Sequence, residues 1–265
     1  MGYAPPVAMR IGFSGTGGAI ATAKRDNTAL VIASGPALLL VDCTGNPPAA
    51  LDRMGFDWTA VGAVLLTHRH ADHLGGLVPL LHQLRIRHRR ASRPPLVVRG
   101  PADAVDVAAR LLEAVDLLDE PEGFEVVLRP LPEDGEVQIG PFAVRSFPVA
   151  HGQVPTAGLR VAPLMQPERA VVYSSDTEPC ERVWHEAADA ALLVHECSSF
   201  VEEAVPGHTT LKQLERVLPA GELNHARLVH LPPASQERER TAQTRLQARF
   251  GDVVRLAHDG EVIDL

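Results

Sequence analysis

Short apolar runs bounded by turn residues alternate along this chain with segments in which apolar positions recur every three or four residues. Such runs are typical of β-strands, and the recurring spacing is typical of amphipathic helices. The runs predict strands at residues 9–13, 28–33, 37–41, 61–66, 96–98, 124–128, 137–139, 142–149, 171–177, 192–197 and 226–230. The spacing predicts helices at residues 47–54, from 74 onward, at 101–118 and from 211 onward. Two β-rich halves, each with helices, favour one α/β sandwich over residues 1–265 rather than two separate domains.

A cluster of polar residues directly follows the strand predicted at residues 61–66. It reads Thr67-His68-Arg69-His70-Ala71-Asp72-His73. His68 and His70 project from the same side of an extended chain, and Asp72 lies at or near the N-cap of the next helix. Gly75 and Gly76 allow the backbone to turn tightly beneath the cluster. Imidazole suits zinc and a carboxylate adds a charged oxygen ligand, so this spacing predicts a divalent-metal site.

The composition narrows the class of protein. The 265 residues are 45% hydrophobic and 22% charged, which is sufficient for a sizeable core. No stretch approaches the roughly twenty apolar residues of a membrane span, and the first residues lack the build of a secretory signal. Cys43, Cys180 and Cys197 show no paired spacing, which argues against a disulfide framework. We therefore expect a cytoplasmic protein with reduced thiols and no membrane partner.

The charge of the chain bears on its partners. The net charge is −8, from 33 acidic and 25 basic residues, which argues against a general polyanion binder. One basic run contains Arg85, Arg87, Arg89, Arg90 and Arg93. Cations are favourable at a helix C-terminus, so the run fits a solvated helix end. It also fits a patch that contacts phosphate, and the sequence leaves both interpretations open.

The segment from His68 to His73 resembles the His-x-His-x-Asp-His signature of the metallo-β-lactamase superfamily. The resemblance implies a four-layer αβ/βα sandwich with one or two metals at one edge of the two sheets. It also implies further ligands at later strand ends, which are matched by His151, Asp176 and His230. Carried over residue by residue, the resemblance implies one metal held by His68, His70 and His151, a second held by Asp72, His73 and His230, and Asp176 as the bridge between them.

Two of these positions separate the chain from other superfamily members. Asp176 stands where the β-lactam-cleaving enzymes commonly have cysteine, which disfavours antibiotic hydrolysis. His70 stands where di-iron oxygen reductases have glutamate, which disfavours a redox role. Thioesterases and lactonases of the superfamily share the ligand set and stay open as alternatives.

Two later segments are similar to the tRNA 3′-processing endonuclease, or ribonuclease Z, branch of the superfamily. They are the pair His195-Glu196 at a strand end and Gly207-His208-Thr209-Thr210 before a helix. This resemblance implies that His208 protonates the leaving oxygen and that Glu196 orients the imidazole. We expect Asp72 to be a catalytic residue, together with His208 and Glu196, as well as a metal ligand.

The chain lacks one feature of the ribonuclease Z branch that bears on which substrate it cleaves. The tRNA-processing enzymes carry a protruding arm between the ligands matched here by His151 and Asp176, but only 25 positions separate these residues. We therefore expect a dinuclear zinc hydrolase, with Mn²⁺ or Fe²⁺ as other metals, that cleaves a small or cyclic phosphodiester or an RNA 3′ end. Tight tRNA binding is not expected.

Two alternatives belong to other classes of function. One is a hydrolase of the same fold that acts on aryl sulfates, lactones or thioesters. The other is a non-catalytic metal-binding or RNA-binding protein, which is disfavoured because no ligand is missing. Homodimers are common among the relatives, so a homodimer is also considered. The natural substrate, the physiological metal and the oligomeric state are left open by the sequence.

Overall fold

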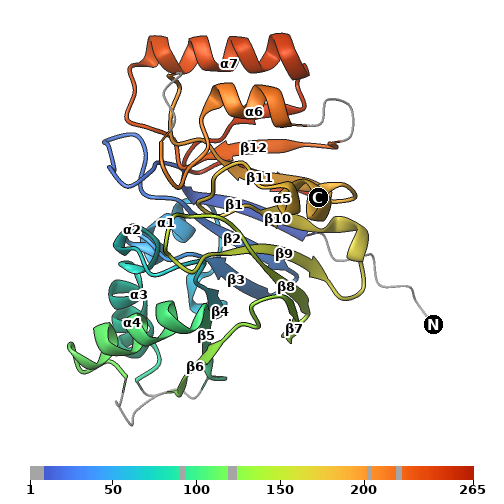
Figure 1. The fold of residues 1–265 in the computed structure, drawn as a ribbon. Helices are drawn as coiled ribbons and strands as arrows, with labels where there is room; N and C mark the ends of the chain where they lie inside the picture. Colours follow the sequence, from blue (N-terminus) through green and yellow to red (C-terminus); the bar gives the residue numbers. More distant parts are fainter. Residues whose placement is uncertain (1–8, 90–92, 119–123, 202–204, 219–222) are drawn as a thin grey trace.

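The computed structural model describes residues 9–89, 93–118, 124–201, 205–218 and 223–265. Over these ranges the chain forms two seven-stranded sheets that pack face to face, with helices on both outer faces (Figure 1). This is the four-layer αβ/βα arrangement that the resemblance implies. Among the described residues, no helix is both long and apolar enough to cross a lipid bilayer.

The first sheet has the strand order β14-β1-β2-β3-β4-β5-β6. Its strands are β1 (Met9–Gly15), β2 (Ala29–Ser34), β3 (Ala37–Val41), β4 (Val61–Leu65), β5 (Leu96–Gly100), β6 (Val126–Pro130) and β14 (Val262–Asp264). The strands β2 and β3 form an antiparallel hairpin, and β3 to β6 run parallel. The carboxyl ends of the parallel strands therefore meet at one edge of the sheet.

The second sheet has the strand order β13-β12-β11-β10-β9-β8-β7. Its strands are β7 (Gly135–Ile139), β8 (Phe142–Pro148), β9 (Ala157–Pro163), β10 (Val171–Tyr173), β11 (Leu192–Glu196), β12 (Ala226–Val229) and β13 (Val254–Leu256). The strands β10 to β13 run parallel, and β8 has the same direction because two antiparallel pairings relate it to β10. The loops after β8, β10, β11 and β12 thus emerge at a common edge.

The helices are divided between the two outer faces. Next to the first sheet lie α1 (Pro47–Arg53), α2 (Ala71–Leu74), α3 (Leu77–Arg87), α4 (Ala102–Glu113) and the 3₁₀ turn η1 (Trp58–Ala60). Next to the second sheet lie α5 (Glu181–Ala187), α6 (Leu211–Val217), α7 (Gln236–Phe250) and the 3₁₀ turn η2 (Pro167–Arg169). The core between the sheets draws on both of them, with Phe13 and Leu65 from the first and Val144 and Leu192 from the second.

The helix predicted from residue 74 onward differs from the observed structure. It is divided into α2 and α3 by Gly75 and Gly76. A Cβ at Gly76 would lie only 2.7 Å from the Thr44 backbone nitrogen, so this close approach requires glycine. Asp72 is the second residue of α2, whose N-cap is His70, so Asp72 lies near the cap without forming it.

Two other predicted elements are shorter in the structure. The helix predicted over residues 101–118 ends at Glu113, and Asp116 has a positive φ of 55° in the turn that follows. The strand predicted over residues 171–177 ends at Tyr173. Ser175 then has a φ of 56°, which is the left-handed region and ends the extended conformation just before Asp176.

Part of the basic run is built into the fold. Arg85 is buried and donates hydrogen bonds of 2.9 Å to the carbonyls of Leu117 and Phe124, and its guanidinium lies over the Phe124 ring. Arg93 lies over the same ring and donates to the Val61 carbonyl. The rest of the run comprises Arg87 and Arg89, which are exposed, and Arg90, which lies outside the described residues. Arg85 and Arg93 therefore have structural roles.

Candidate metal centre

The seven ligand candidates from the sequence lie together at the common edge of the two sheets. They are His68, His70, Asp72, His73, His151, Asp176 and His230, and they fall into overlapping groups whose candidate ligand atoms lie within 4.8 Å of one another. Each follows a strand, because β4, β8, β10 and β12 end at this edge. The fold therefore collects residues from distant parts of the sequence into one cluster.

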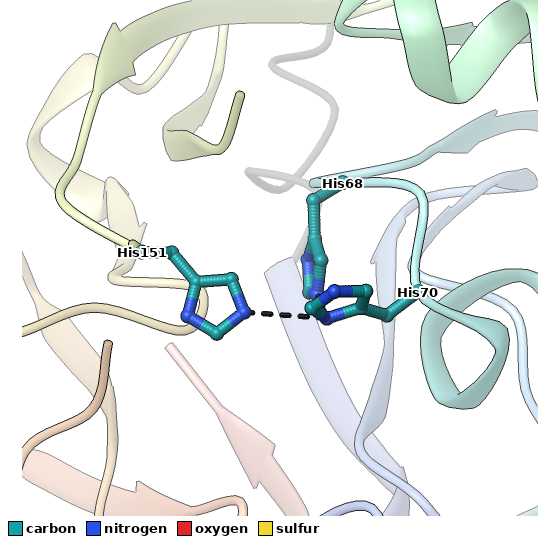
Figure 2. Close-up of side chains that lie close together, drawn as sticks. All are labelled: His68, His70 and His151. Atoms are coloured by element: carbon teal, nitrogen blue, oxygen red, sulfur yellow. Dashed lines mark hydrogen bonds between the residues drawn. The ribbon is translucent and has the colours of Figure 1, made fainter. Parts of the chain in front are cut away.

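Three imidazoles form one side of this cluster (Figure 2). His68 and His70 come from the segment after β4, and His151 comes from the segment after β8. His70 Nδ1 lies 3.0 Å from His68 Nε2 and 3.2 Å from His151 Nε2. Ring nitrogens from three side chains thus point at a shared space.

Asp176 lies between the two sides of the cluster and is almost completely buried. Its Oδ2 atom is 3.2 Å from His230 Nε2, 3.4 Å from His73 Nε2, 3.8 Å from His68 Nε2 and 4.0 Å from His151 Nε2. One carboxylate oxygen therefore faces imidazoles from both groups of candidates.

Asp72 completes the other side. Its Oδ2 atom lies 3.6 Å from Nε2 of both His73 and His230. His230 follows β12 with a positive φ of 54°, which turns its side chain out of the strand direction. Gly18 lies close to this ring. A Cβ at that position would be only 3.2 Å from the nearest ring atoms.

The two sides of the cluster differ in protonation. Burial would lower the pKa of His73 and of His230, but the charge of Asp176 outweighs it and raises both, so these two imidazoles must release a proton before a metal binds. Burial lowers the pKa of His68 well below its usual value, and burial also lowers the pKa of His70 and of His151. These three imidazoles are therefore held neutral, which is the form that binds a metal. Burial alone would raise the pKa of Asp176, but the charges of His230 and His73 outweigh it and hold that pKa well below its usual value.

A buried carboxylate supports His73 from behind. Asp42 Oδ2 lies 2.8 Å from His73 Nδ1, and the Thr67 backbone N–H donates to Asp42 Oδ1 at 2.9 Å. The hydrogen bond fixes the tautomer of His73 and leaves Nε2 directed at the cluster. Asp42 therefore supports a candidate ligand and is not itself among the candidate ligands.

The donor set fits divalent cations. Nε2 of His73, Nε2 of His230 and Oδ1 of Asp176 are buried and have no hydrogen-bond partner among the described residues. Burying such polar atoms without a partner is costly. Ligand atoms about 2.1 Å from a tetrahedral cation lie roughly 3.4 Å apart, and the contacts described above, from 3.0 to 4.0 Å, are close to that spacing. Cations here would therefore satisfy atoms that the protein leaves unpaired.

Glu196 and His208 lie beside this cluster. Glu196 Oε1 is 2.9 Å from His208 Nδ1, and the same carboxylate accepts hydrogen bonds from the backbone N–H groups of Thr177 at 2.7 Å and Ser198 at 3.2 Å. Glu196 is fully buried, and burial, followed by the charge of Asp176, raises its pKa well above the usual value. His208 Nδ1 is 3.9 Å from Asp176 Oδ2, so its imidazole borders the space that the candidate ligands surround.

The segment that carries His208 is also tied to His151 by contacts that the sequence did not reveal. His151 Nδ1 donates to the Gly207 carbonyl at 2.7 Å, and the Gly207 N–H donates to Glu178 Oε1 at 3.0 Å. Gly207 has a φ of 79°, which favours glycine. In the sequence, Glu178 is marked only by its position two residues after Asp176, and this signal is weak.

Known proteins resemble this chain in sequence and fold. Ribonuclease Z of Myxococcus xanthus strain DK1622 is 28% identical, over 97% of this chain and 98% of that protein. Among solved structures, the metallo-β-lactamase fold protein YhfI from Bacillus subtilis superposes with a TM-score of 0.78 at 20% identity, covering 97% of this chain and 100% of YhfI. The short form of human tRNase Z (ELAC1) superposes with a TM-score of 0.72 at 21% identity, covering 96% and 98%.

The chain is therefore similar in sequence to ribonuclease Z and has the metallo-β-lactamase fold. A family model described as anti-Pycsar protein Apyc1 matches residues 9–251, which is most of the chain. The protein therefore belongs to the Anti-Pycsar protein Apyc1 family.

Proposed function

We propose that this protein is a metal-dependent phosphodiesterase whose reaction centre lies around Asp176. The observation that carries this proposal is the position of Asp176 Oδ2, which lies within 4.0 Å of imidazole nitrogens on both sides of the cluster. A carboxylate in that position suits two neighbouring cations, and two-cation sites are a recurring arrangement for phosphoryl chemistry. The ribonuclease Z of M. xanthus, whose name denotes cleavage of RNA, supports the same class of reaction.

The ligand assignment uses two of the candidate groups, while other groups of nearby donor atoms include His208 and Glu196. His68, His70 and His151 would hold one cation, Asp72, His73 and His230 would hold the other, and Asp176 would bind both. Zinc suits this donor set because imidazole nitrogen predominates and the carboxylates add charge. Mn²⁺ and Fe²⁺ are the other metals to be tested. We also propose that the two halves form one domain, since the core between the sheets draws on both.

The cations, when bound, would lower the pKa of water toward neutrality and offset the negative charge that develops on the phosphoryl oxygens. The remaining steps belong to the chain. His208 donates a proton to the leaving oxygen, since its ring borders the cluster and its Nδ1 is held by Glu196. Glu196 fixes the ring orientation without touching the substrate, so it is a positioning residue. Asp72 acts through the charge that it adds beside His230.

A small or cyclic phosphodiester fits this protein better than precursor tRNA. The structure describes every residue between His151 and Asp176, and they form only β9, η2 and β10 with their connecting loops. No segment there is long enough for a protruding arm. The side chains of Arg85 and Arg93 are engaged by backbone carbonyls and Phe124, so these two members of the basic run are not directed at a phosphate.

A substrate panel tests this function. Protein supplied with Zn²⁺ or Mn²⁺ is assayed with bis(4-nitrophenyl) phosphate, a cyclic nucleotide, a precursor tRNA, an aryl sulfate and an acyl lactone. We expect metal-dependent hydrolysis of the two small diesters at rates well above those of the sulfate and the lactone. Preferred cleavage of the sulfate or the lactone would contradict the proposal, as would diester hydrolysis that survives removal of the metal and mutation of Asp176 to Ala.

A further inference from the structure

The candidate ligands differ in how their imidazole rings are held. Asp42 Oδ2 supports His73 at its Nδ1 atom. The Gly207 carbonyl accepts a hydrogen bond from Nδ1 of His151. His230 has no such support, since its Nδ1 atom is buried without a hydrogen-bond partner among the described residues. Metal-binding histidines almost always have a partner at the second ring nitrogen, so the orientation of His230 must be set in another way.

The backbone of His230 provides the first constraint. Its φ of 54° is uncommon for a residue other than glycine, and it turns the chain out of β12. The His230 backbone N–H donates to Thr28 Oγ1 at 2.9 Å. Thr28 is fully buried and directly precedes β2, so this hydrogen bond joins the edge of the first sheet to the end of a strand in the second. The turn that brings His230 Nε2 to within 3.2 Å of Asp176 Oδ2 is thus held from the opposite sheet.

The hydroxyl of Thr28 is itself fixed in direction. It donates to the Gly17 carbonyl at 2.9 Å while it accepts from the His230 N–H. A hydroxyl has one proton to donate, so these two contacts determine its orientation. Gly17 is also bridged to Leu231, the residue after His230. The loop between β1 and β2 is therefore tied to the chain at His230 and directly after it.

The same loop limits the position of the imidazole ring. The Gly18 N–H donates to the Leu231 carbonyl at 2.9 Å, which holds Gly18 beside His230. A Cβ at Gly18 would lie 3.2 Å from Cε1 and Nδ1 of the ring. The His208 ring stacks on the His230 ring at a centroid distance of 5.2 Å. Packing against these neighbours leaves the ring little space to turn, although its Nδ1 atom has no hydrogen bond.

We propose that Thr28 and Gly18 are positioning residues for the second cation, the one assigned to Asp72, His73 and His230. The Thr28 hydroxyl fixes the backbone of His230, and Gly18 fixes its ring. The inference rests on the proposed function and adds two residues that touch neither a cation nor the substrate. Within the described part of the chain, the Thr28 hydroxyl makes no hydrogen bond to the three histidines of the other group (Figure 2). Loss of this hydroxyl should therefore affect the two cations unequally.

Three threonine variants test this assignment. Thr28→Val keeps the shape of the side chain and removes the hydroxyl, which leaves the His230 N–H without its acceptor. Thr28→Ser retains the hydroxyl and should restore the behaviour of the wild type. Thr44→Val is the matched control, because Thr44 is also buried and its hydroxyl also donates to a backbone carbonyl. That carbonyl belongs to Asn27, which is not a candidate ligand.

Metal affinity is the main readout. Protein stripped with a chelator is titrated with Zn²⁺ against a chromophoric competitor, which resolves the two dissociation constants. Thr28→Val should raise one of them about 10–100-fold, as is usual when a group that orients a ligand is lost, and leave the other within about threefold. Thr28→Ser and Thr44→Val should keep both constants within about threefold of the wild type. The kcat of Thr28→Val for bis(4-nitrophenyl) phosphate should return to near the wild-type value at saturating Zn²⁺, because the hydroxyl acts only through His230.

A second variant keeps the test independent of the folding of Thr28→Val. Thermal unfolding of the metal-free proteins reports whether each variant folds. Gly18→Ala adds a Cβ that presses on the His230 ring, so it should raise the same single dissociation constant. This variant decides the assignment if Thr28→Val does not fold.

The outcomes that would overturn the inference are distinct from failure of the proposed function. Two unchanged constants in the folded variant, or an equal rise in both, would overturn the positioning role. A Thr28→Ser protein that behaves like Thr28→Val would also overturn it, because the hydroxyl would then not be responsible. Binding of fewer than two equivalents of Zn²⁺ by the wild-type protein would instead refute the proposed two-cation centre.

Discussion

Glu196 Oε1 lies 2.9 Å from Nδ1 of His208, although the two residues belong to different segments of the chain. Glu196 is the last residue of β11, and His208 stands two residues before the Thr210 N-cap of α6. The carboxylate also accepts two backbone hydrogen bonds, so its own position is determined by the fold. The imidazole is therefore oriented by a rigid partner, and its role can be separated from that of the proposed metal ligands.

Replacing His208 should affect substrates according to their leaving group. An alkoxide is a poor leaving group and needs a proton as the bond breaks, whereas a nitrophenolate leaves without one. General acid catalysis typically contributes about 10²–10⁴-fold. His208→Ala should therefore slow kcat for a diester with an alkoxide leaving group by about this factor and change a nitrophenyl diester much less. Steady-state rates on both substrates measure this difference.

Two companion variants make the His208 test specific. Glu196→Gln should show the same pattern more weakly, because it loosens the imidazole without removing it. His185→Ala, an exposed position in α5, should leave both rates unchanged. Equal slowing of both substrates by His208→Ala, or a loss of bound metal, would mean that His208 acts as a ligand or a scaffold residue.

His195 should make the protein less stable in mild acid. Burial lowers the pKa of His195 to about 4, while the ring stacks on Trp184 and its Nδ1 donates to the Glu196 carbonyl. The unfolded chain takes up this proton near pH 6.5 and the folded chain only near pH 4. The stability from this residue is therefore complete above about pH 6.5 and is lost as the pH falls toward 4.

The size of this effect can be measured against a variant. His195→Phe keeps an aromatic ring beside Trp184 and removes the titration. Between pH 7 and pH 4.5 the free energy of unfolding of the wild type should fall by about 2.5 kcal/mol more than that of the variant. Urea unfolding at the two pH values measures the difference. Identical pH dependence in both proteins would show that His195 is already protonated, or not titrating, in this range.

Arg85 should stabilise the fold, and Arg87 should not. Replacing Arg85 with Ala leaves the buried carbonyls of Leu117 and Phe124 without their donor. We expect a loss of about 2–3 kcal/mol in the free energy of unfolding, since each unpaired buried group costs about 1–3 kcal/mol. Arg87→Ala at an exposed position should change stability by no more than about 0.5 kcal/mol. Comparable losses in urea unfolding would contradict the structural role of Arg85.

Binding to tRNA should be weak at physiological salt. Of the basic run, Arg87 and Arg89 are exposed, and each phosphate contact contributes roughly one unit to the log-log salt slope. Mutation of both to Ala should therefore lower the slope by no more than about two units. Fluorescence anisotropy with labelled precursor tRNA at several salt concentrations measures it. Nanomolar affinity in physiological salt would contradict the preference for small diesters.

The sequence predicts the motif from His68 to His73 by its own spacing, whereas His151, Asp176 and His230 are implied by the resemblance to the metallo-β-lactamase superfamily. His68 to His73 form a local motif, and His151, Asp176 and His230 each come after a strand that its own apolar pattern reveals. Parallel strands bring their carboxyl ends to one edge, so the gathering of these residues follows from strand direction. The support for His73 from Asp42 depends instead on the register between β3 and β4, which a pattern of single residues does not contain.

Other elements escaped prediction for physical reasons. The helix α7 buries only Ala242 and Leu246, so its apolar spacing is too sparse to recognise. The strand β14 has three residues and pairs with β1 from the other end of the chain. Glu178 accepts a hydrogen bond from the Gly207 backbone N–H, and its position two residues after Asp176 is too weak a sequence signal to predict that contact.

Metal content measured together with activity tests the central claim most directly. Protein stripped with a chelator and titrated with Zn²⁺ should regain hydrolysis of bis(4-nitrophenyl) phosphate as about two equivalents bind per chain. Asp176→Ala and His70→Ala should bind less metal and lose activity, whereas His258→Ala, at an exposed histidine outside the cluster, should match the wild type. Full activity in the stripped protein, or unchanged metal content in both cluster variants, would contradict a reaction centre built on two cations around Asp176.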